Sequence, residues 1–143
     1  MRWRIFAFVI GVLLIVGLIP ISYEASPRWD VSVVAEDGHP LPGVNVRLVY
    51  QNYSAEDEGH EITLATDENG HVLFPEQFQK SSFARRIFYT LSSARAGVHA
   101  SFGRHAYVFA FDGKGHEGNA ANGEYITNWL GFPPSVKSKI ILH

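Results

Sequence analysis

The longest apolar stretch of the chain lies near its N-terminus. Residues 5–23 carry no charged side chain, with Arg2 and Arg4 before them and Glu24 after them. As a helix, this stretch is about 28 Å long, close to the hydrocarbon thickness of a bilayer. The pattern predicts a transmembrane helix within residues 1–24, and the two arginines predict a cytoplasmic N-terminus.

A cleaved signal peptide is the alternative interpretation of this stretch. Cleavable signals end in small residues in an A-x-A-like pattern, whereas a cut after Ala25 places Tyr23 at the −3 position. We therefore expect an uncleaved signal-anchor, a short linker at residues 25–29 and an exported domain at residues 30–143. In a bacterial cell this is a single-pass protein of the inner (plasma) membrane with a periplasmic C-terminal domain.

Beyond the linker, apolar and polar residues alternate along several short segments, as they do in strands with one buried face. Segments 30–37, 104–113 and 135–143 show this pattern. It is clearest over residues 44–52, where the predicted core face carries Val44, Val46, Leu48 and Tyr50. In the last segment, the residues that share one face are Val136, Ile140 and Leu142.

Turn residues separate these segments. Asp67-Glu68-Asn69-Gly70 lies between the apolar runs 62–66 and 71–75. Asn-Gly in this position is a strong hairpin signal. We therefore predict that the two runs pair with each other as a hairpin.

One stretch departs from the alternation and repeats its apolar residues at helical spacing. These residues are Phe83, Ile87, Phe88, Leu91 and Ala94. The pattern predicts an amphipathic helix over residues 82–95, with Ser81 or Ser82 as its N-cap and Gly97 at its end. A long strand is the alternative, because several apolar residues of this stretch also share a face of period two.

Together these elements predict a mainly β protein, an antiparallel β-sandwich with one inserted helix, preceded by a transmembrane helix. The net charge of −2 provides no basic field for nucleic acid, so no nucleic-acid partner is expected. The chain has no cysteine, which excludes disulfides and thiolate metal sites.

Two segments carry a family resemblance. Residues 37–48 read DGHPLPGVNVRL, and residues 66–75 read TDENGHVLFP. A D-G-x-P-L-P-G-V turn and strand followed by a T-D-x-x-G turn resembles the carboxypeptidase regulatory-like domain. The resemblance implies a prealbumin-like (transthyretin-like) β-sandwich over the exported domain.

Domains of this family are usually accessory, so the resemblance implies adhesion, stabilisation or ligand presentation. We expect a membrane-anchored, exported, non-enzymatic binding module of the cell envelope. Its expected contacts are the membrane, through the N-terminal helix, and an envelope protein or glycan. A structural subunit of a membrane complex is a second hypothesis.

An enzymatic hypothesis depends on residues 97–108, GVHASFGRHAYV. It predicts a small hydrolase or metal-binding enzyme with a polar pocket formed by His99, Ser101, Arg104 and His105. The alternative is a tight loop that returns from the helix to a strand. Transthyretin-like hydroxyisourate hydrolases end in Tyr-Arg-Gly-Ser, whereas this chain ends in Ile-Ile-Leu-His. Intradiol dioxygenases hold iron with two tyrosines and two histidines, and no matching motif is recognised.

Other chemistry-bearing residues give weaker signals. Tyr125, Trp129 and Phe132 form a candidate binding surface for a sugar or a protein, with core packing as the alternative. The seven histidines match no compact ligand motif, and the acidic run at residues 56–61 predicts a solvated loop. The sequence therefore predicts neither a metal site nor a cofactor.

Overall fold

The computed structural model describes residues 2–120, 125–127 and 131–143, and this part of the chain is mainly β with two α-helices. The elements are α1 (Arg2–Leu18), β1 (Pro20–Ser26), β2 (Arg28–Val34), β3 (Asn45–Asn52), β4 (His60–Ala65), β5 (His71–Phe74), β6 (Gln77–Ser82), α2 (Phe83–Ala94), a 3₁₀ turn η1 (Gly97–His99), β7 (Arg104–Phe111), β8 (Glu117–Asn119), β9 (Tyr125–Thr127) and β10 (Ser135–Ile141).

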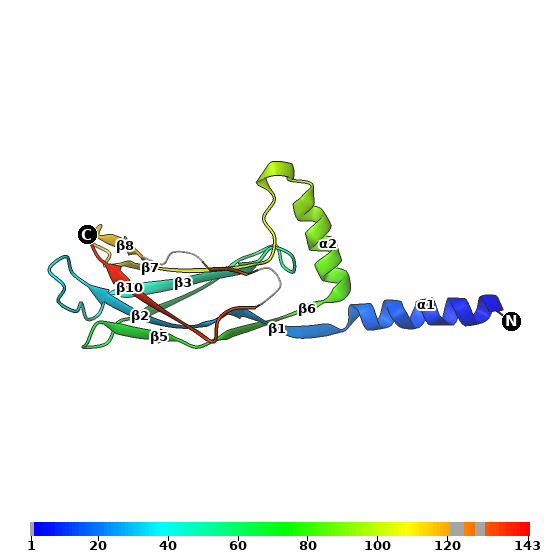
Figure 1. Cartoon of the computed structure of the whole chain (residues 1–143), viewed down its shortest axis with the longest axis horizontal. Helices are drawn as coiled ribbons and strands as arrows, with labels where there is room; N and C mark the ends of the chain where they lie inside the picture. Colours follow the sequence, from blue (N-terminus) through cyan, green and yellow to red (C-terminus); the bar gives the residue numbers. More distant parts are fainter. Residues whose placement is uncertain (1, 121–124, 128–130) are drawn as a thin grey trace.

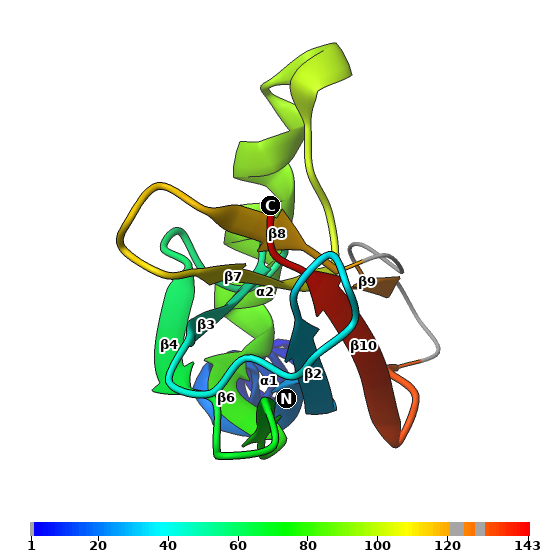
Figure 2. The same ribbon diagram turned by 90° about the vertical axis from the view of Figure 1, so that its left-hand side faces the viewer.

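The strands form two facing sheets and one ribbon (Figure 1). The small sheet has the strand order β10-β2-β5, and the large sheet has the order β4-β3-β7-β8, with β9 also paired to β7. Figure 2 views the molecule end-on, with β2 and β10 on one side and β3, β4 and β7 on the other. Strands β1 and β6 pair as a ribbon that continues from the sandwich toward α1.

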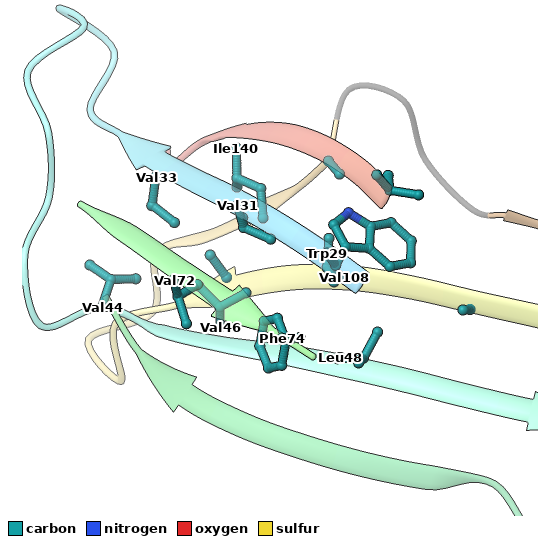
Figure 3. Close-up of a cluster of buried hydrophobic side chains, with 14 of the residues drawn as sticks. Trp29, Val31, Val33, Val44, Val46, Leu48, Val72, Phe74, Val108 and Ile140 are labelled. Carbon is teal, nitrogen blue, oxygen red and sulfur yellow. The ribbon is translucent and has the colours of Figure 1, made fainter. Parts of the chain in front are cut away.

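The core lies between the two sheets (Figure 3). The face predicted for residues 44–52 is confirmed, since Val44, Val46, Leu48 and Tyr50 are all buried. Trp29 enters this core from β2, and its indole Nε1 donates a hydrogen bond to Ser138 Oγ of β10 at 2.7 Å. That bond explains a serine on an otherwise apolar face, because a buried indole N–H needs an acceptor.

The hairpin predicted around Asp67–Gly70 is wrong, although the turn itself is present. Strand β4 pairs with β3 in the large sheet, whereas β5 pairs with β2 in the small sheet. The turn therefore carries the chain from one sheet to the other. Asn-Gly specifies a local chain reversal, but the pairing partner of each strand depends on which core it packs against.

The described strand pairs are antiparallel, as predicted for the sandwich, except at one position. Strand β10 runs parallel to β2, with Val136 beside Trp29 and Ile140 beside Val33. The predicted core face of β10 is nevertheless confirmed, since Val136, Ile140 and Leu142 are buried. Alternation has the same period in either direction, so it identifies the buried face without fixing strand direction.

The N-terminal apolar run divides into two elements. Helix α1 ends at Leu18, and Pro20, which lacks an N–H and cannot continue a helix, opens β1. Within residues 2–120, 125–127 and 131–143, no helix is both long and apolar enough to cross a membrane. The residues expected to form a linker, 25–29, belong to β1 and β2 except for Pro27 between the two strands, and Ala25, Pro27 and Trp29 are fully buried.

The inserted helix is confirmed as α2, Phe83–Ala94. Its N-cap is Ser82, whose side chain accepts a hydrogen bond from the Arg85 N–H at 3.2 Å. This bond satisfies one of the N–H groups that the first turn leaves without a helical partner. Gly97, with a φ of 60°, lies just after the helix and begins η1.

Candidate functional site

A cleft of about 860 Å³ opens between α2 and the sandwich. It lies at the end of the sandwich from which α1 projects (Figure 1). Its walls come from four parts of the chain: β1, the end of β3 with the turn after it, α2, and the segment that enters β7. The lining residues are Tyr23, Asn52, Ser54, Phe83, Arg86, Ile87, Thr90, Leu91, Phe102, Gly103 and Arg104.

One wall of the cleft is apolar. Phe83, Ile87 and Leu91 follow each other at four-residue spacing, so they lie along one face of α2. Each remains substantially exposed, and no residue of α2 is buried. The structure therefore provides an apolar surface here without covering it.

The facing wall is polar and aromatic, with Tyr23 at its centre. The Arg86 guanidinium lies 4.9 Å from the centroid of the Tyr23 ring, a cation–π contact. The Tyr23 hydroxyl hydrogen-bonds with Asn52 and Glu56. Desolvation, followed by the nearby Glu56 carboxylate, raises the pKa of Tyr23 to about 12. Tyr23 thus presents a neutral hydroxyl to the cleft at physiological pH.

Glu56 lies behind this wall and hydrogen-bonds with neighbouring residues. Its Oε1 accepts a hydrogen bond from the Asn52 N–H at 2.7 Å, and its Oε2 lies 3.0 Å from His60 Nε2. The acidic run at residues 56–61 is therefore only partly the solvated loop that the sequence predicts. His60 and Glu61 belong to β4, where the Glu61 carboxylate lies 3.0 Å from the Arg47 guanidinium.

Of the four residues predicted to form a polar pocket, Arg104 is the one that lines the cleft. Its Nη1 donates to the Glu24 carbonyl at 2.8 Å. His105 Nε2 lies 3.1 Å from the Phe102 carbonyl oxygen, and its ring meets Tyr53 edge-on at 4.9 Å. His99 is exposed in η1, and Ser101 is half-buried in the segment that follows.

The predicted aromatic surface is only partly within the described structure. Trp129 lies outside the described residues, and Tyr125 belongs to β9, beside Ala106 of β7. Phe132 is half-buried and packs against the core, and its ring lies 5.3 Å from the Arg104 guanidinium. Phe132 thus helps to position a residue of the cleft.

Histidine–carboxylate pairs occur at several exposed sites. His116 Nδ1 lies 2.6 Å from Asp112, and this hydrogen bond lowers the pKa of Asp112 to about 2. His143 Nδ1 lies 2.9 Å from Glu36, and His39 pairs with Asp37. Within the part of the chain that the structure describes, no three such side chains are grouped to hold a metal ion.

Sequence reasoning missed Tyr23, Asn52 and Arg86 as residues of one site. Tyr23 closes the apolar run, Asn52 ends a strand, and Arg86 lies on a predicted helix. No local pattern relates positions so far apart in sequence. One sequence signal pointed to Arg86. Arg85 and Arg86 interrupt the apolar positions of the predicted helix, and such polar residues mark a face of the helix that differs from the apolar one.

Comparison with known proteins adds little to this description. No family model and no curated protein matches the chain. Among solved structures, it is similar to 3-chlorocatechol 1,2-dioxygenase from Rhodococcus opacus 1CP, with a TM-score of 0.45 and 16% identity. The match covers 85% of this chain and 62% of the dioxygenase chain. A similarity of this size carries no argument about function.

Proposed function

We propose that this protein is a membrane-attached, non-enzymatic binding module that holds a protein partner in the cleft beside α2. The observation that carries the proposal is the cleft itself, which combines an exposed apolar helix face with an arginine-bearing polar wall. Such a surface suits an amphipathic partner segment, with apolar side chains for Phe83 and Leu91 and an acidic or carbonyl group for Arg86.

Membrane attachment through α1 is part of the proposal. The side chains of this helix are exposed and almost all apolar, and Figure 1 shows α1 projecting away from the sandwich. A 17-residue helix is about 26 Å long, compared with about 30 Å for a hydrocarbon layer. With Arg2 and Arg4 on the cytoplasmic side, the sandwich lies on the outer face of the plasma membrane, in the periplasm of a bacterial cell.

We further propose that the sandwich is of the carboxypeptidase regulatory-like, prealbumin-like type. The two segments that carry the resemblance lie together in space. The Gly43 N–H donates to the Thr66 carbonyl at 3.0 Å, and Thr66 Oγ1 donates to the Leu41 carbonyl at 2.7 Å. Contact between the two turns supports the view that they form one structural signature.

Site-specific photo-crosslinking of the full chain in its own cells tests the binding function. A photoreactive phenylalanine analogue at Thr90 lies in the cleft, and the same analogue at Leu73, exposed on β5, is the control. We expect one reproducible protein adduct at Thr90, absent at Leu73 and reduced when Arg86→Gln is added. Equal adduct patterns at both positions, or no adduct at Thr90, contradict the proposal.

A further inference from the structure

Helix α2 is amphipathic, yet none of its apolar residues is buried against the sandwich. Soluble domains normally bury the apolar face of such a helix and expose the polar face. Here Phe83 and Leu91 are each 63% exposed and Phe88 is 65% exposed. Val98, in the η1 turn that follows, is 97% exposed.

The polar side of α2 makes the contacts with the sandwich. Ser93 Oγ donates to the Tyr53 carbonyl at 3.1 Å, and the Arg86 guanidinium stacks on Tyr23. Arg85 Nη2 lies 3.7 Å from the Asp57 carboxylate. At 100° per residue, Phe88 points about 160° away from Arg86, so it faces away from the sandwich. The Phe88 side of α2 is therefore presented outward, whereas Phe83, Ile87 and Leu91 line the cleft.

The position of α2 relative to α1 indicates what covers this face. The two helices are in contact, and α2 stands across the direction in which α1 projects (Figure 1). A bilayer that receives α1 along its axis consequently extends alongside α2. Phe88, on the outward side of α2, then lies at the level of the lipid headgroups.

The charge of the segment fits a lipid surface. Between Glu76 and Asp112 the chain has no acidic residue, yet it carries Lys80, Arg85, Arg86, Arg95 and Arg104. Lys80 and Arg95 are exposed near the two ends of the helix. Interfacial helices combine an apolar face that enters the headgroup boundary with Lys and Arg that attract anionic lipids.

We propose that α2 is an interfacial helix that binds the surface of an anionic lipid bilayer through Phe88, together with Val98 of the η1 turn. The bilayer is the one that α1 enters, so the inference rests on the membrane attachment proposed above. Two helices then hold the sandwich, and the cleft between α2 and β1 opens at the membrane surface.

Single-cysteine labelling of the full chain in vesicles tests the inference, since the native chain has no cysteine to remove. An environment-sensitive fluorophore is attached in turn to Phe88→Cys, Thr90→Cys, Leu14→Cys and Leu73→Cys. Thr90 is the matched control on α2, because it lines the cleft, whereas Leu73 lies on the sandwich. The vesicles contain phosphatidylcholine with phosphatidylglycerol, and nitroxide-bearing lipids quench the label by contact.

We expect shallow nitroxide lipids to quench the label at Phe88→Cys at least about threefold more strongly than the label at Thr90→Cys, because an interfacial helix enters lipid with its apolar face only. The label at Leu14→Cys should be quenched by deeper nitroxides, and the label at Leu73→Cys by none. In vesicles of phosphatidylcholine alone, quenching at Phe88→Cys should fall while quenching at Leu14→Cys persists.

The outcomes separate the inference from the attachment on which it rests. Quenching at Leu14→Cys without quenching at Phe88→Cys overturns the interfacial helix and leaves membrane attachment intact. No quenching at either position contradicts both. Protection of the Phe88→Cys label only after a protein partner is added also overturns the inference, because Phe88 then belongs to a protein interface.

Discussion

At the scale of single residues, Gly70 determines how closely the two turns approach each other. Gly70 and Gly43 both have a φ of 72°, so an alanine at either position is strained. A Cβ on Gly70 would lie 2.7 Å from the Val33 carbonyl oxygen and 2.9 Å from the Leu41 nitrogen, whereas a Cβ on Gly43 would meet nothing within 4 Å. An alanine at Gly43 therefore tests backbone strain alone, whereas an alanine at Gly70 tests strain together with steric overlap.

We predict that Gly43→Ala lowers the free energy of unfolding by about 1–2 kcal/mol, the cost of the left-handed conformation. Gly70→Ala should cost at least about 1 kcal/mol more, because backbone atoms must also move. Urea denaturation of the two variants measures the difference. Equal losses would mean that the turns separate freely.

Thr66 is the second residue that joins the turns. Its buried hydroxyl donates to the Leu41 carbonyl and accepts from the Val44 N–H at 3.0 Å. Thr66→Val keeps the shape and removes both bonds, so we predict a loss of about 1–3 kcal/mol in the free energy of unfolding. Thr66→Ser, which keeps the hydroxyl, is the control. A valine variant as stable as the serine variant would contradict this role.

Tyr23 gives a prediction that depends on pH. Its pKa is raised to about 12 in the folded protein, from about 10 in the unfolded chain. The unfolded state therefore releases its proton first, so the free energy of unfolding is unaffected by this group below pH 10 and falls as the pH rises toward 12. Ultraviolet absorbance of tyrosinate should show one late-titrating tyrosine that disappears in Tyr23→Phe. An unchanged titration in Tyr23→Phe would mean that another tyrosine has the raised pKa.

At the scale of elements, Ser82 controls the start of α2. Ser82→Ala removes the side-chain acceptor for the Arg85 N–H, so we predict a loss of about 1 kcal/mol in stability, local to the helix. Ser92→Ala, at an exposed position within α2, is the control and should have little effect. Hydrogen exchange of the first-turn amides measures the change. Equal exchange in both variants would show that α2 is held by its contacts alone.

The elements also show which features could be predicted from the sequence. The faces of β3 and β10 were predictable, because alternation records which side chains leave water. The start of α2 was predictable because its cap is local. The partners of β4 and β5 and the direction of β10 were not, since pairing depends on contacts between distant segments. In β7 both alternating faces are apolar, so the pattern did not show which one is buried. The structure buries the face with the smaller side chains, Ala106, Val108 and Ala110.

The candidate site was less predictable than the fold. Arg104 was identified from an unusual local sequence, and it does line the cleft. The rest of the polar wall combines Tyr23, Asn52 and Arg86, which are brought together only when α2 and the ribbon fold against the sandwich. A sequence pattern shows which residues are neighbours along the chain. A site depends on which side chains the fold brings together in space.

At the scale of the whole molecule, charge is divided between its parts. Acidic residues are excluded from residues 77–111, which carry 5 of the 12 Lys and Arg residues, Lys80, Arg85, Arg86, Arg95 and Arg104. Salt shortens the Debye length from about 10 Å at 0.1 M to about 3 Å at 1 M. We predict that high salt weakens lipid quenching at Phe88→Cys on anionic vesicles and leaves quenching at Leu14→Cys unchanged. A salt-independent signal at Phe88→Cys would exclude an electrostatic contribution.

The buried passage from β1 into β2 has a mechanical consequence. No slack segment separates α1 from the core, so tension on the helix reaches β2 directly. The chain ends after β10, at the opposite end of the molecule from α1 (Figure 1). Because β2 and β10 are parallel neighbours, pulling the two ends apart slides one strand along the other and loads all their hydrogen bonds at once. The sandwich is thus suited to resist stretching between the end from which α1 projects and its C-terminal end.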